Sequence, residues 1–345
     1  MARLTLGSIV RGTALPYDSG QGVRLKCRAN HVGKAEFCQQ ESELMSEASE
    51  RLGVITDSHR VRGNRTLNIV SIAIPFLGTL ACITFGILHG FSSFSWLVFG
   101  ASFALTAIGI GVGLHRYFVH NAFRTRRVLR FILGVLGSSA MQGPIDRWVA
   151  DHRRHHRFTD QAHDPHSPYW VGEAPIRTKF AGLVHSHIGW MLTGLVSDES
   201  KYAADILREP ISAWCSRNYW FLCAVSLLLP ALAGLIASGI VEAVSCFLLG
   251  GCARITLLHN ITWAVNSFGH MFGSRVPGST DQSRDSVVLA LLLMGEGLHS
   301  YHHMYPNAAL NEPWWLDVNG AIICGLEKLG LAHDVVRYRL AGKPA

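Results

Sequence analysis

The sequence predicts an all-α, polytopic membrane protein with four transmembrane helices in two hairpins and a cytosolic helical cap that holds a di-metal site. Three observations predict this fold. Two long stretches lack charged residues almost completely, arginines are concentrated on one side of them, and eight histidines form three clusters at or near their edges. Of the 345 residues, 49% are hydrophobic and 16% are charged, against roughly 25% charged residues in an average soluble domain.

Two stretches are long and apolar enough to cross a membrane four times. Residues 66–115 contain no Asp, Glu, Lys or Arg, and residues 218–253 contain Glu242 as their one charged side chain. Because one crossing needs about 20 apolar residues, each stretch holds a pair of spans. We expect the transmembrane helices at 67–88, 93–114, 218–237 and 241–261.

Arginines flank the first pair of spans on one side. Two tight hairpins leave both chain ends and the connection between the pairs on that same side, so we expect a cytosolic cap built from 115–216 and 263–335. The positive-inside rule assigns this side to the cytoplasm, of a bacterial inner membrane or of a eukaryotic endoplasmic reticulum. The net charge of +7 then reflects contact with anionic membrane lipid, and no nucleic-acid partner is expected. The arginines are Arg60, Arg62 and Arg65 before the first span and Arg124, Arg126, Arg127 and Arg130 after the second.

The two ends of the chain differ from its apolar middle. Residues 1–64 are polar, of mixed charge and without sustained periodicity, which predicts a flexible cytosolic leader rather than a signal peptide; Met45 is an alternative start. We expect one membrane domain over 65–335 and a tail at 336–345. The eight cysteines include no C-x2-C pair and are expected to be reduced and structural.

Three histidine clusters predict a metal site. Eight of the 18 histidines belong to them, and imidazole is the commonest protein ligand for transition metals. Six of the eight stand at offsets of three and four residues, which place side chains on one helical face. Eight imidazoles exceed what one ion accepts, so two ions are the natural number. The clusters are His115 and His120; His152, His155 and His156; and His299, His302 and His303.

The clusters differ in how specific they are. The second and third share the spacing H-x2-H-H, which recurs 147 residues later, from 152 to 299. An offset of five places His115 and His120 about 140° apart on an ideal α-helix, so we expect them to reach a metal from a helix end. His270 lies just past the fourth span, at the level of His115, and is a ninth candidate, with Asn266 on the same helical face. The carboxylates available to orient imidazoles are Asp146, Asp151, Asp160, Asp164 and Glu296.

At these residues the sequence resembles the membrane-bound fatty acyl desaturases with three histidine boxes, and in particular their stearoyl-CoA Δ9-desaturase branch. Further segments are similar and occur in the expected order, so the resemblance covers residues 65–335. These segments are Trp148–His152, Asp164–Ser167, His187–Trp190, Thr262–Ser267, Ser283–Ser286 and Gly295–Gly297.

The resemblance implies four transmembrane helices beneath a cytosolic cap that holds two iron ions. The implied ligands are the eight clustered histidines and His270, with Asn266 acting through a bound water. The implied reaction uses O2 to introduce a cis double bond into an acyl chain, carried as a thioester of CoA or of an acyl carrier protein, or as a lipid. Trp148 and Trp263 become candidate walls of a kinked acyl tunnel.

Two departures from the family pattern bear on the substrate. Animal acyl-CoA members have an Arg-Lys pair where this chain has Gly194 and Leu195, which leaves room for an acyl carrier protein or a glycerolipid. Ser300 stands where Asn is usual, and we expect it to be tolerated. Phe103 lies about 18 Å from His115 along the second span at 1.5 Å per residue; with Phe99 it would cap the tunnel for a shorter chain, unless both are ordinary packing residues.

Desaturation breaks two unactivated C–H bonds, which no side-chain acid or base can do, so O2 must be activated at a metal with open coordination positions. No His-Pro-Gly-Gly segment of a fused cytochrome b5 occurs, so a separate electron donor is expected: a ferredoxin, a cytochrome b5 or a reductase. Ligand spacing leaves a di-iron hydroxylase or acetylenase open. A second alternative is a non-enzymatic haem-binding or metal-handling protein, although such proteins place histidines or ionisable residues within their spans.

Overall fold

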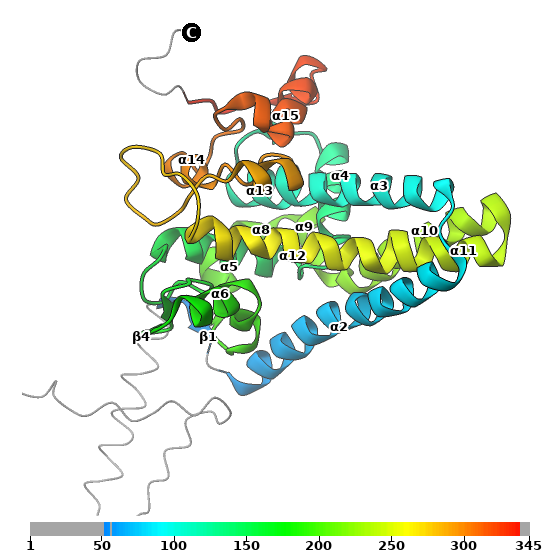
Figure 1. Cartoon of the computed structure of the whole chain (residues 1–345). Coiled ribbons are helices and arrows are strands. Elements are labelled where there is room, and N and C mark those ends of the chain that lie inside the picture. Colours follow the sequence, from blue (N-terminus) through cyan, green and yellow to red (C-terminus); the bar gives the residue numbers. More distant parts are fainter. Residues whose placement is uncertain (1–51, 56, 339–345) are drawn as a thin grey trace, which may run out of the picture. The chain divides into compact units, whose positions relative to one another are not determined.

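The computed structural model describes residues 52–55 and 57–338. Most of the expected leader, Met45 and the tail from residue 339 onward therefore lie outside the described residues. Within the described residues the fold is helical except for three two-stranded ladders (Figure 1).

Four helical segments are long and apolar enough to cross a membrane, which confirms the expected number. The first is α2 (Ser58–His89) and the third is α10 (Tyr219–Ser238). The second joins α3 (Ser93–Ile108) to η1 (Gly109–Val119). The fourth consists of α11 (Ile240–Cys246), η3 (Phe247–Ala253), α12 (Arg254–Ser267) and η4 (Phe268–His270).

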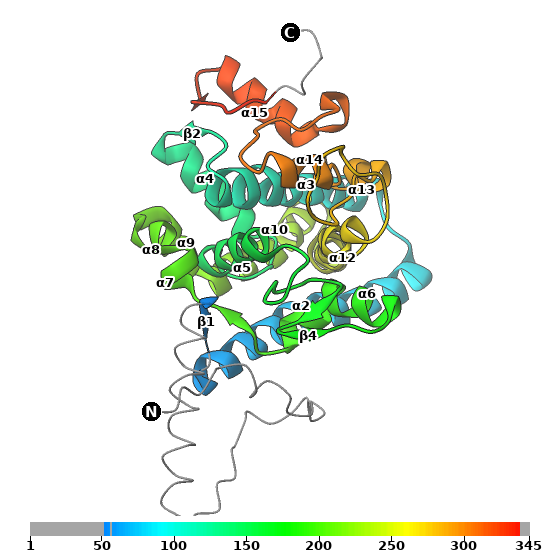
Figure 2. The same cartoon turned by 90° about the vertical axis from the view of Figure 1, so that its left-hand side faces the viewer.

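These four segments pack along one another: α10 contacts α11 and η3, and η3 also contacts α2 and α3. Three shorter helices, α5, α6 and α14, lie together at one end of the four segments, on the left in Figure 1, and Figure 2 views the molecule from that side. The shorter helices are α4 (Arg127–Ser138), α5 (Ile145–Phe158), α6 (Lys179–His187), η2 (Gly189–Leu192), α7 (Glu199–Tyr202), α8 (Ala204–Arg208), α9 (Pro210–Arg217), α13 (Val287–Leu292), α14 (His299–Met304), η5 (Trp314–Leu316) and α15 (Val318–Lys328).

The helix ends away from the histidines lie within one residue of the expected positions, because a glycine with positive φ ends each of two helices. Gly90 follows α2 at φ 71°, and Gly239 follows α10 at φ 85°. Three of the four opposite ends extend further than expected, whereas α10 begins at Tyr219, one residue later than expected. Helix α2 begins at Ser58, because Asp57 accepts hydrogen bonds from the backbone N–H groups of the first turn at 2.8 and 3.1 Å. The last residues assigned to the leader therefore belong to the first helix.

The strands were not expected from the sequence. Each is two residues long, too short to produce an alternating pattern. All three pairs are antiparallel and join segments outside the four long helices: β1 (Val54–Ile55) pairs with β5 (Val196–Ser197), β2 (Arg124–Thr125) with β6 (Ala332–His333), and β3 (Trp170–Val171) with β4 (Ala174–Pro175).

The second segment changes its winding before it reaches the histidines. From Gly109 to Val119 it is a π-helix, and the N–H of His120 still donates to the carbonyl of His115, five residues earlier, at 3.2 Å. Glycines on this helix allow neighbours to approach closely; a side chain at Gly113 would come within 2.9 Å of the Leu133 carbonyl on α4. Because a π-helix brings residues i and i+5 to one side, the separation of about 140° that an ideal α-helix would give does not apply here. The two imidazole centroids lie 5.0 Å apart.

The fourth segment contains a fully buried arginine. Arg254 donates to the Gly250 carbonyl at 2.8 Å and to the carbonyl and hydroxyl of Ser226 on α10 at 2.8 and 2.9 Å. No carboxylate contacts it among the described residues. Neutral acceptors therefore satisfy this cation, and they join the third and fourth segments.

A second buried arginine connects the π-helix to the C-terminal part of the fold. The guanidinium of Arg116 donates two hydrogen bonds of 2.8 Å to Asp317 and one of 3.0 Å to Glu296. Asp317 also accepts the N–H of Asn311 at 2.6 Å and of Gly320, in the first turn of α15, at 2.9 Å. One carboxylate thus holds the arginine, a loop and a helix start together.

We expect Asp317→Asn to lower the free energy of unfolding by about 3–5 kcal/mol, because it leaves Arg116 buried without its main counter-ion. The control is Glu327→Gln. Glu327 lies on α15 and forms an exposed pair with Arg337, which lies beyond that helix, and its substitution should change stability by less than about 1 kcal/mol. Thermal unfolding of the detergent-solubilised variants measures both. Equal effects of the two substitutions would contradict the importance assigned to the buried pair.

Candidate metal centre and adjoining pocket

Helix α5 presents His152, His155 and His156 on one face, as their offsets predict. The arginines between them point elsewhere. Arg153 forms an ion pair of 2.6 Å with Asp205 on α8. The buried Arg154 donates a hydrogen bond of 3.0 Å to the hydroxyl of Ser197 on β5. These arginines therefore fix the orientation of α5 and leave the imidazole face free to meet other histidines.

Helix α14 carries the third cluster. Asp285 holds its first turn by accepting the N–H groups of Ser300 at 2.7 Å and Tyr301 at 3.2 Å. The hydroxyl of Ser300 accepts the N–H of Val276 at 3.0 Å. Ser300, which stands where the family usually has Asn, therefore links α14 to the loop at Val276.

Five of the nine candidate histidines form one group: His115, His120, His152, His156 and His302. The Nε2 atom of His302 lies 3.0 Å from that of His115 and 3.0 Å from that of His156. The Nε2 atoms of His152 and His156 are 3.1 Å apart. Nε2 of His120 is buried and has no hydrogen-bond partner among the described residues.

The other four form a second group: His155, His270, His299 and His303. The Nε2 atom of His303 lies 3.2 Å from that of His155 and 3.1 Å from that of His299, and the latter is 2.9 Å from that of His270. The groups adjoin, because the His156 and His303 rings stack with centroids 4.5 Å apart. All nine expected histidines thus converge, and their role as ligands stays a prediction.

Carboxylates hold four of the nine imidazoles at Nδ1. Three of the five carboxylates expected from the sequence form such contacts: Asp160, Asp164 and Glu296. Asp281 is a fourth, which the sequence did not indicate. Asp146 and Asp151, also nominated, do not contact these imidazoles. The pairs are His155 with Asp164 at 3.0 Å, His270 with Asp160 at 3.1 Å, His303 with Asp281 at 2.9 Å, and His115 with Glu296.

This arrangement tests whether metal ions fit. An imidazole that donates its Nδ1–H to a carboxylate has an unprotonated Nε2, with the lone pair pointing outward. His155 and His303 are both held in this way, yet their Nε2 atoms are 3.2 Å apart, lone pair against lone pair. A cation between them removes the repulsion, and nitrogens about 2.1 Å from one ion lie about 3 Å from each other. The donor set therefore fits one metal ion per group.

The charge state of the site agrees with this fit. Burial, and then the repulsion of neighbouring imidazoles, lowers the pKa of six of these histidines well below 6.5, so they are neutral and able to bind metal. Burial alone would raise the pKa of Glu296, but His115 and Arg116 outweigh it and hold that pKa at about 2. The six histidines are His120, His152, His155, His156, His299 and His302.

His166 is closer to the centre than the sequence indicated. With His155 and Asp164 it forms a third group of potential donors, and its ring centroid is 4.2 Å from that of His155. Its Nδ1 is buried, lies 3.9 Å from a carboxylate oxygen of Asp164, and has no hydrogen-bond partner among the described residues. The available signal was the segment Asp164–Ser167, which resembles the family but lacks the repeated histidine spacing.

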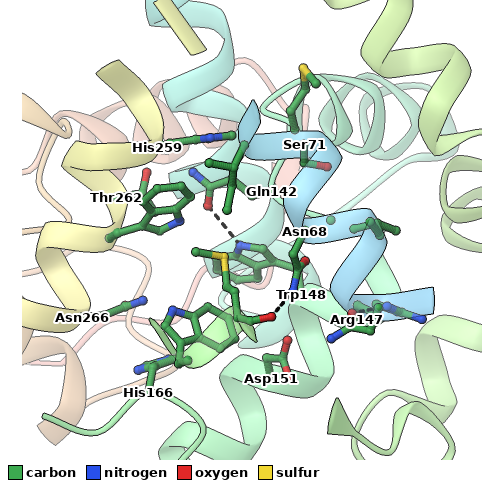
Figure 3. Close-up of a pocket in the computed structure, with 18 of the residues that line it drawn as sticks. Asn68, Ser71, Gln142, Arg147, Trp148, Asp151, His166, His259, Thr262 and Asn266 are labelled. Carbon is green, nitrogen blue, oxygen red and sulfur yellow. Dashed lines mark hydrogen bonds between the residues drawn. The ribbon is translucent and has the colours of Figure 1, made fainter. Parts of the chain in front are cut away.

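A pocket of about 80 Å³ adjoins the five-histidine group at His152 (Figure 3). The two expected tunnel walls, Trp148 and Trp263, line it, as does Asn266. Trp148 stacks on His152 with centroids 5.0 Å apart and 10° between the planes. The indole is therefore at once a pocket wall and a support for a candidate ligand.

Sequence reasoning missed several polar groups of this pocket. Gln142 accepts the indole N–H of Trp148 at 3.4 Å (Figure 3). The side-chain N–H groups of Gln142 and Trp190 are buried and have no acceptor among the described residues. An unsatisfied buried donor is uncommon in a folded protein and calls for an acceptor, such as a water or a ligand oxygen.

Phe99 and Phe103, the two phenylalanines expected to cap a tunnel, pack within apolar clusters of the described residues. Phe99 and Phe103 stack on each other at 6.3 Å between centroids, and neither lines the described pocket. Phe103 packs against the main apolar core, and Phe99 packs against a smaller cluster near Cys82. Their role in limiting chain length stays a prediction.

Known proteins resemble this chain over most of its length. Residues 94–341 match the family model described as "Fatty acid desaturase". The chain is 39% identical to the "Hex-5-enoyl-[acyl-carrier protein] acetylenase" of Moorena producens (strain JHB), over 76% of this chain and 83% of that protein. It is 34% identical to the "sn-1 stearoyl-lipid 9-desaturase" of Synechocystis sp., over 70% and 73%, respectively. It is 30% identical to the human "Stearoyl-CoA desaturase", over 77% and 73%.

We expect His155→Ala and His302→Ala each to lower the bound metal, because each removes a donor from one group. His333→Ala, which alters an exposed histidine on β6, is the control and should retain the wild-type metal content. Elemental analysis of protein that has inserted into membranes measures the result. Wild-type metal content in either variant would remove that histidine from the ligand set.

Asp281→Asn should weaken metal binding about 10–100-fold without removing a ligand, because the carboxylate orients His303 and increases its basicity. Competition with a chelator measures the affinity. Asp334→Asn, which alters an exposed ion pair with Arg124, serves as the control. Unchanged affinity in Asp281→Asn would show that this contact does not affect the centre.

Proposed function

The chain belongs to the fatty acid desaturase family and is a membrane oxidoreductase, and we propose that it is an O2-dependent acyl desaturase with two iron ions, one in each histidine group. The observation that carries the proposal is the convergence of nine imidazoles, four of them oriented by carboxylates, beside a pocket lined by Trp148 and Trp263. Membership in an enzyme family also removes the non-enzymatic haem-binding and metal-handling alternatives.

The reaction converts –CH2–CH2– and O2 into –CH=CH– and two molecules of water. The substrate supplies two electrons and two protons, so two further electrons and two protons must come from elsewhere. Iron supplies the oxidising power that side chains lack. A separate ferredoxin, cytochrome b5 or reductase would supply the electrons.

The protein's own residues position the chain and exclude water. Trp148 and Trp263 enclose the acyl chain, and the stacking of Trp148 on His152 fixes the wall relative to the centre. The free N–H groups of Gln142 and Trp190 would donate to carbonyl oxygens of the substrate. Asn266, which lines the same pocket, would hold a water beside the five-histidine group.

We place the histidine groups on the cytoplasmic side, in a cap above two helical hairpins, within a bacterial inner membrane or an endoplasmic reticulum membrane. Arginines support this orientation. Arg60, Arg62 and Arg65 lie in the first turns of α2, and Arg126 and Arg127 begin α4, whereas the connections at Gly90 and Gly239 carry no arginine or lysine.

An acyl carrier protein thioester is the substrate class that the observations favour. Gly194 occupies one position of the Arg-Lys pair of acyl-CoA enzymes, and its φ of 84° disfavours any side chain there. The Moorena relative is named for an acyl carrier protein substrate. That name also supports acetylenase activity as a second candidate function, in which the same centre removes two further hydrogens from an alkene.

Incubation of the iron-loaded protein with hexanoyl and hexenoyl carrier-protein thioesters, ferredoxin, its reductase, NADPH and O2 tests both functions. Mass spectrometry should show loss of two hydrogens per turnover, with an alkene product from the first substrate and an alkyne product if the second function holds. His302→Ala should form less than about 1% of the product, since activity needs the intact centre, and His333→Ala should form the wild-type amount. Incorporation of oxygen into the product would instead establish a hydroxylase.

A further inference from the structure

A second pocket, of about 440 Å³, opens beside the first. Leu67 on α2 and Arg147 on α5 line both pockets, so the two pockets adjoin. The second pocket is lined by three arginines, two carboxylates and an apolar part: Arg60, Arg147 and Arg217; Asp146 and Glu199; and Leu67, Pro144 and Leu207.

The arginines of this pocket are incompletely neutralised. Arg60 and Arg147 share the buried carboxylate of Glu199, which lies 3.4 Å from Nε of Arg147. Asp146 is engaged by the backbone N–H of Arg147 at 2.9 Å. Arg217 is exposed, and its one described hydrogen bond goes from Nε to a carbonyl of its own helix. No carboxylate pairs with Arg217 among the described residues, so its terminal N–H groups are available to an anion.

We propose that this pocket binds the phosphodiester of the phosphopantetheine arm of an acyl carrier protein, an inference that rests on the proposed desaturase function. The arm has an anionic end, a branched apolar part, two amides and a terminal thioester. Arg60 and Arg217 would bind the phosphate through charge-assisted hydrogen bonds. Leu67, Pro144 and Leu207 would contact the apolar part. The thioester would then lie in the first pocket, beside the unpaired donors of Gln142 and Trp190.

The charges around the mouth favour a carrier protein over free CoA. Arg62 and Arg65 on α2 and Arg208 on α8 are exposed, and the same two helices contribute Arg60 and Leu207 to the pocket, which suits the acidic surface of a carrier protein. Gly194 and Leu195 stand where acyl-CoA enzymes have a basic pair and contribute no cation, although Arg65 of α2 lies against Gly194. With two cations fewer, one phosphodiester is better matched than the additional phosphates of CoA.

Equilibrium binding to the full-length, iron-loaded chain in nanodiscs of neutral lipid tests the proposal. The probes are hexanoyl carrier protein, hexanoyl phosphopantetheine, and hexanoyl pantetheine without the phosphate. Arg217→Glu should weaken binding of the first two by about tenfold or more and leave the third unchanged, and Arg217→Gln should give a smaller loss. The charge-matched control is Arg127→Glu on α4, an exposed arginine away from both pockets, which should alter none of the three.

Three results would overturn the proposal: unchanged affinity in Arg217→Glu, an equal loss in Arg127→Glu, or an effect of Arg217→Glu on anionic phosphatidylglycerol vesicles alone, which would assign the basic face to lipid. The assay needs no reductant or turnover. A chain that forms no alkene but binds the phosphate-bearing probes through Arg217 would contradict the proposed reaction and support this site. An active enzyme whose affinity for the phosphate-bearing probes is unchanged by Arg217→Glu would support the proposed reaction and contradict this site.

Discussion

The contact between a carboxylate and the Nδ1–H of an imidazole is the interaction on which this centre depends, because it decides which nitrogen of each ring carries the proton. Four histidines are held in this way, and for His155 and His303 the contact directs an unprotonated Nε2 toward the interior. Without the carboxylates, either tautomer could form, and the rings could turn to hydrogen-bond one another. Held as they are, the lone pairs converge, and the arrangement is stable when a cation lies among them.

Glu296 connects this chemistry to the rest of the fold. One of its oxygens contacts His115, and the other accepts hydrogen bonds from Arg116 at 3.0 Å and Asn319 at 2.9 Å. Arg116 in turn is bound to Asp317 at the start of α15. The position of a candidate ligand on the second long segment is thus coupled, through buried charges, to a helix about 200 residues later in the sequence. Buried ion pairs of this kind are costly to break singly, so the centre and the C-terminal packing should lose order together.

The two adjoining pockets differ in polarity, and the apolar one lies beside the histidine groups. The first pocket, which adjoins the five-histidine group at His152, has aromatic walls that suit an apolar chain. The second pocket is lined by charged side chains and is open to solvent, which suits a polar carrier. A substrate that joins an apolar chain to an anionic group needs two such environments, because each part then remains in surroundings that solvate it.

Composition and spacing alone determined the four apolar segments, the repeated H-x2-H-H clusters on helical faces, and the nomination of His270, since these depend on local periodicity and on the length of a membrane crossing. Tertiary structure decided the rest. The π-helix that brings His115 and His120 to one side depends on glycines packed against α4, and no spacing rule for an ideal α-helix foresees it. Asp281, His166 and Gln142 acquire their roles from how loops and helices pack in space: Asp281 meets His303 22 residues later in the sequence, and Gln142 shares a pocket with residues of α2 and α12. The grouping of nine histidines into five and four follows from the same cause, because it is set by which helices pack together and not by the order of residues along any one of them.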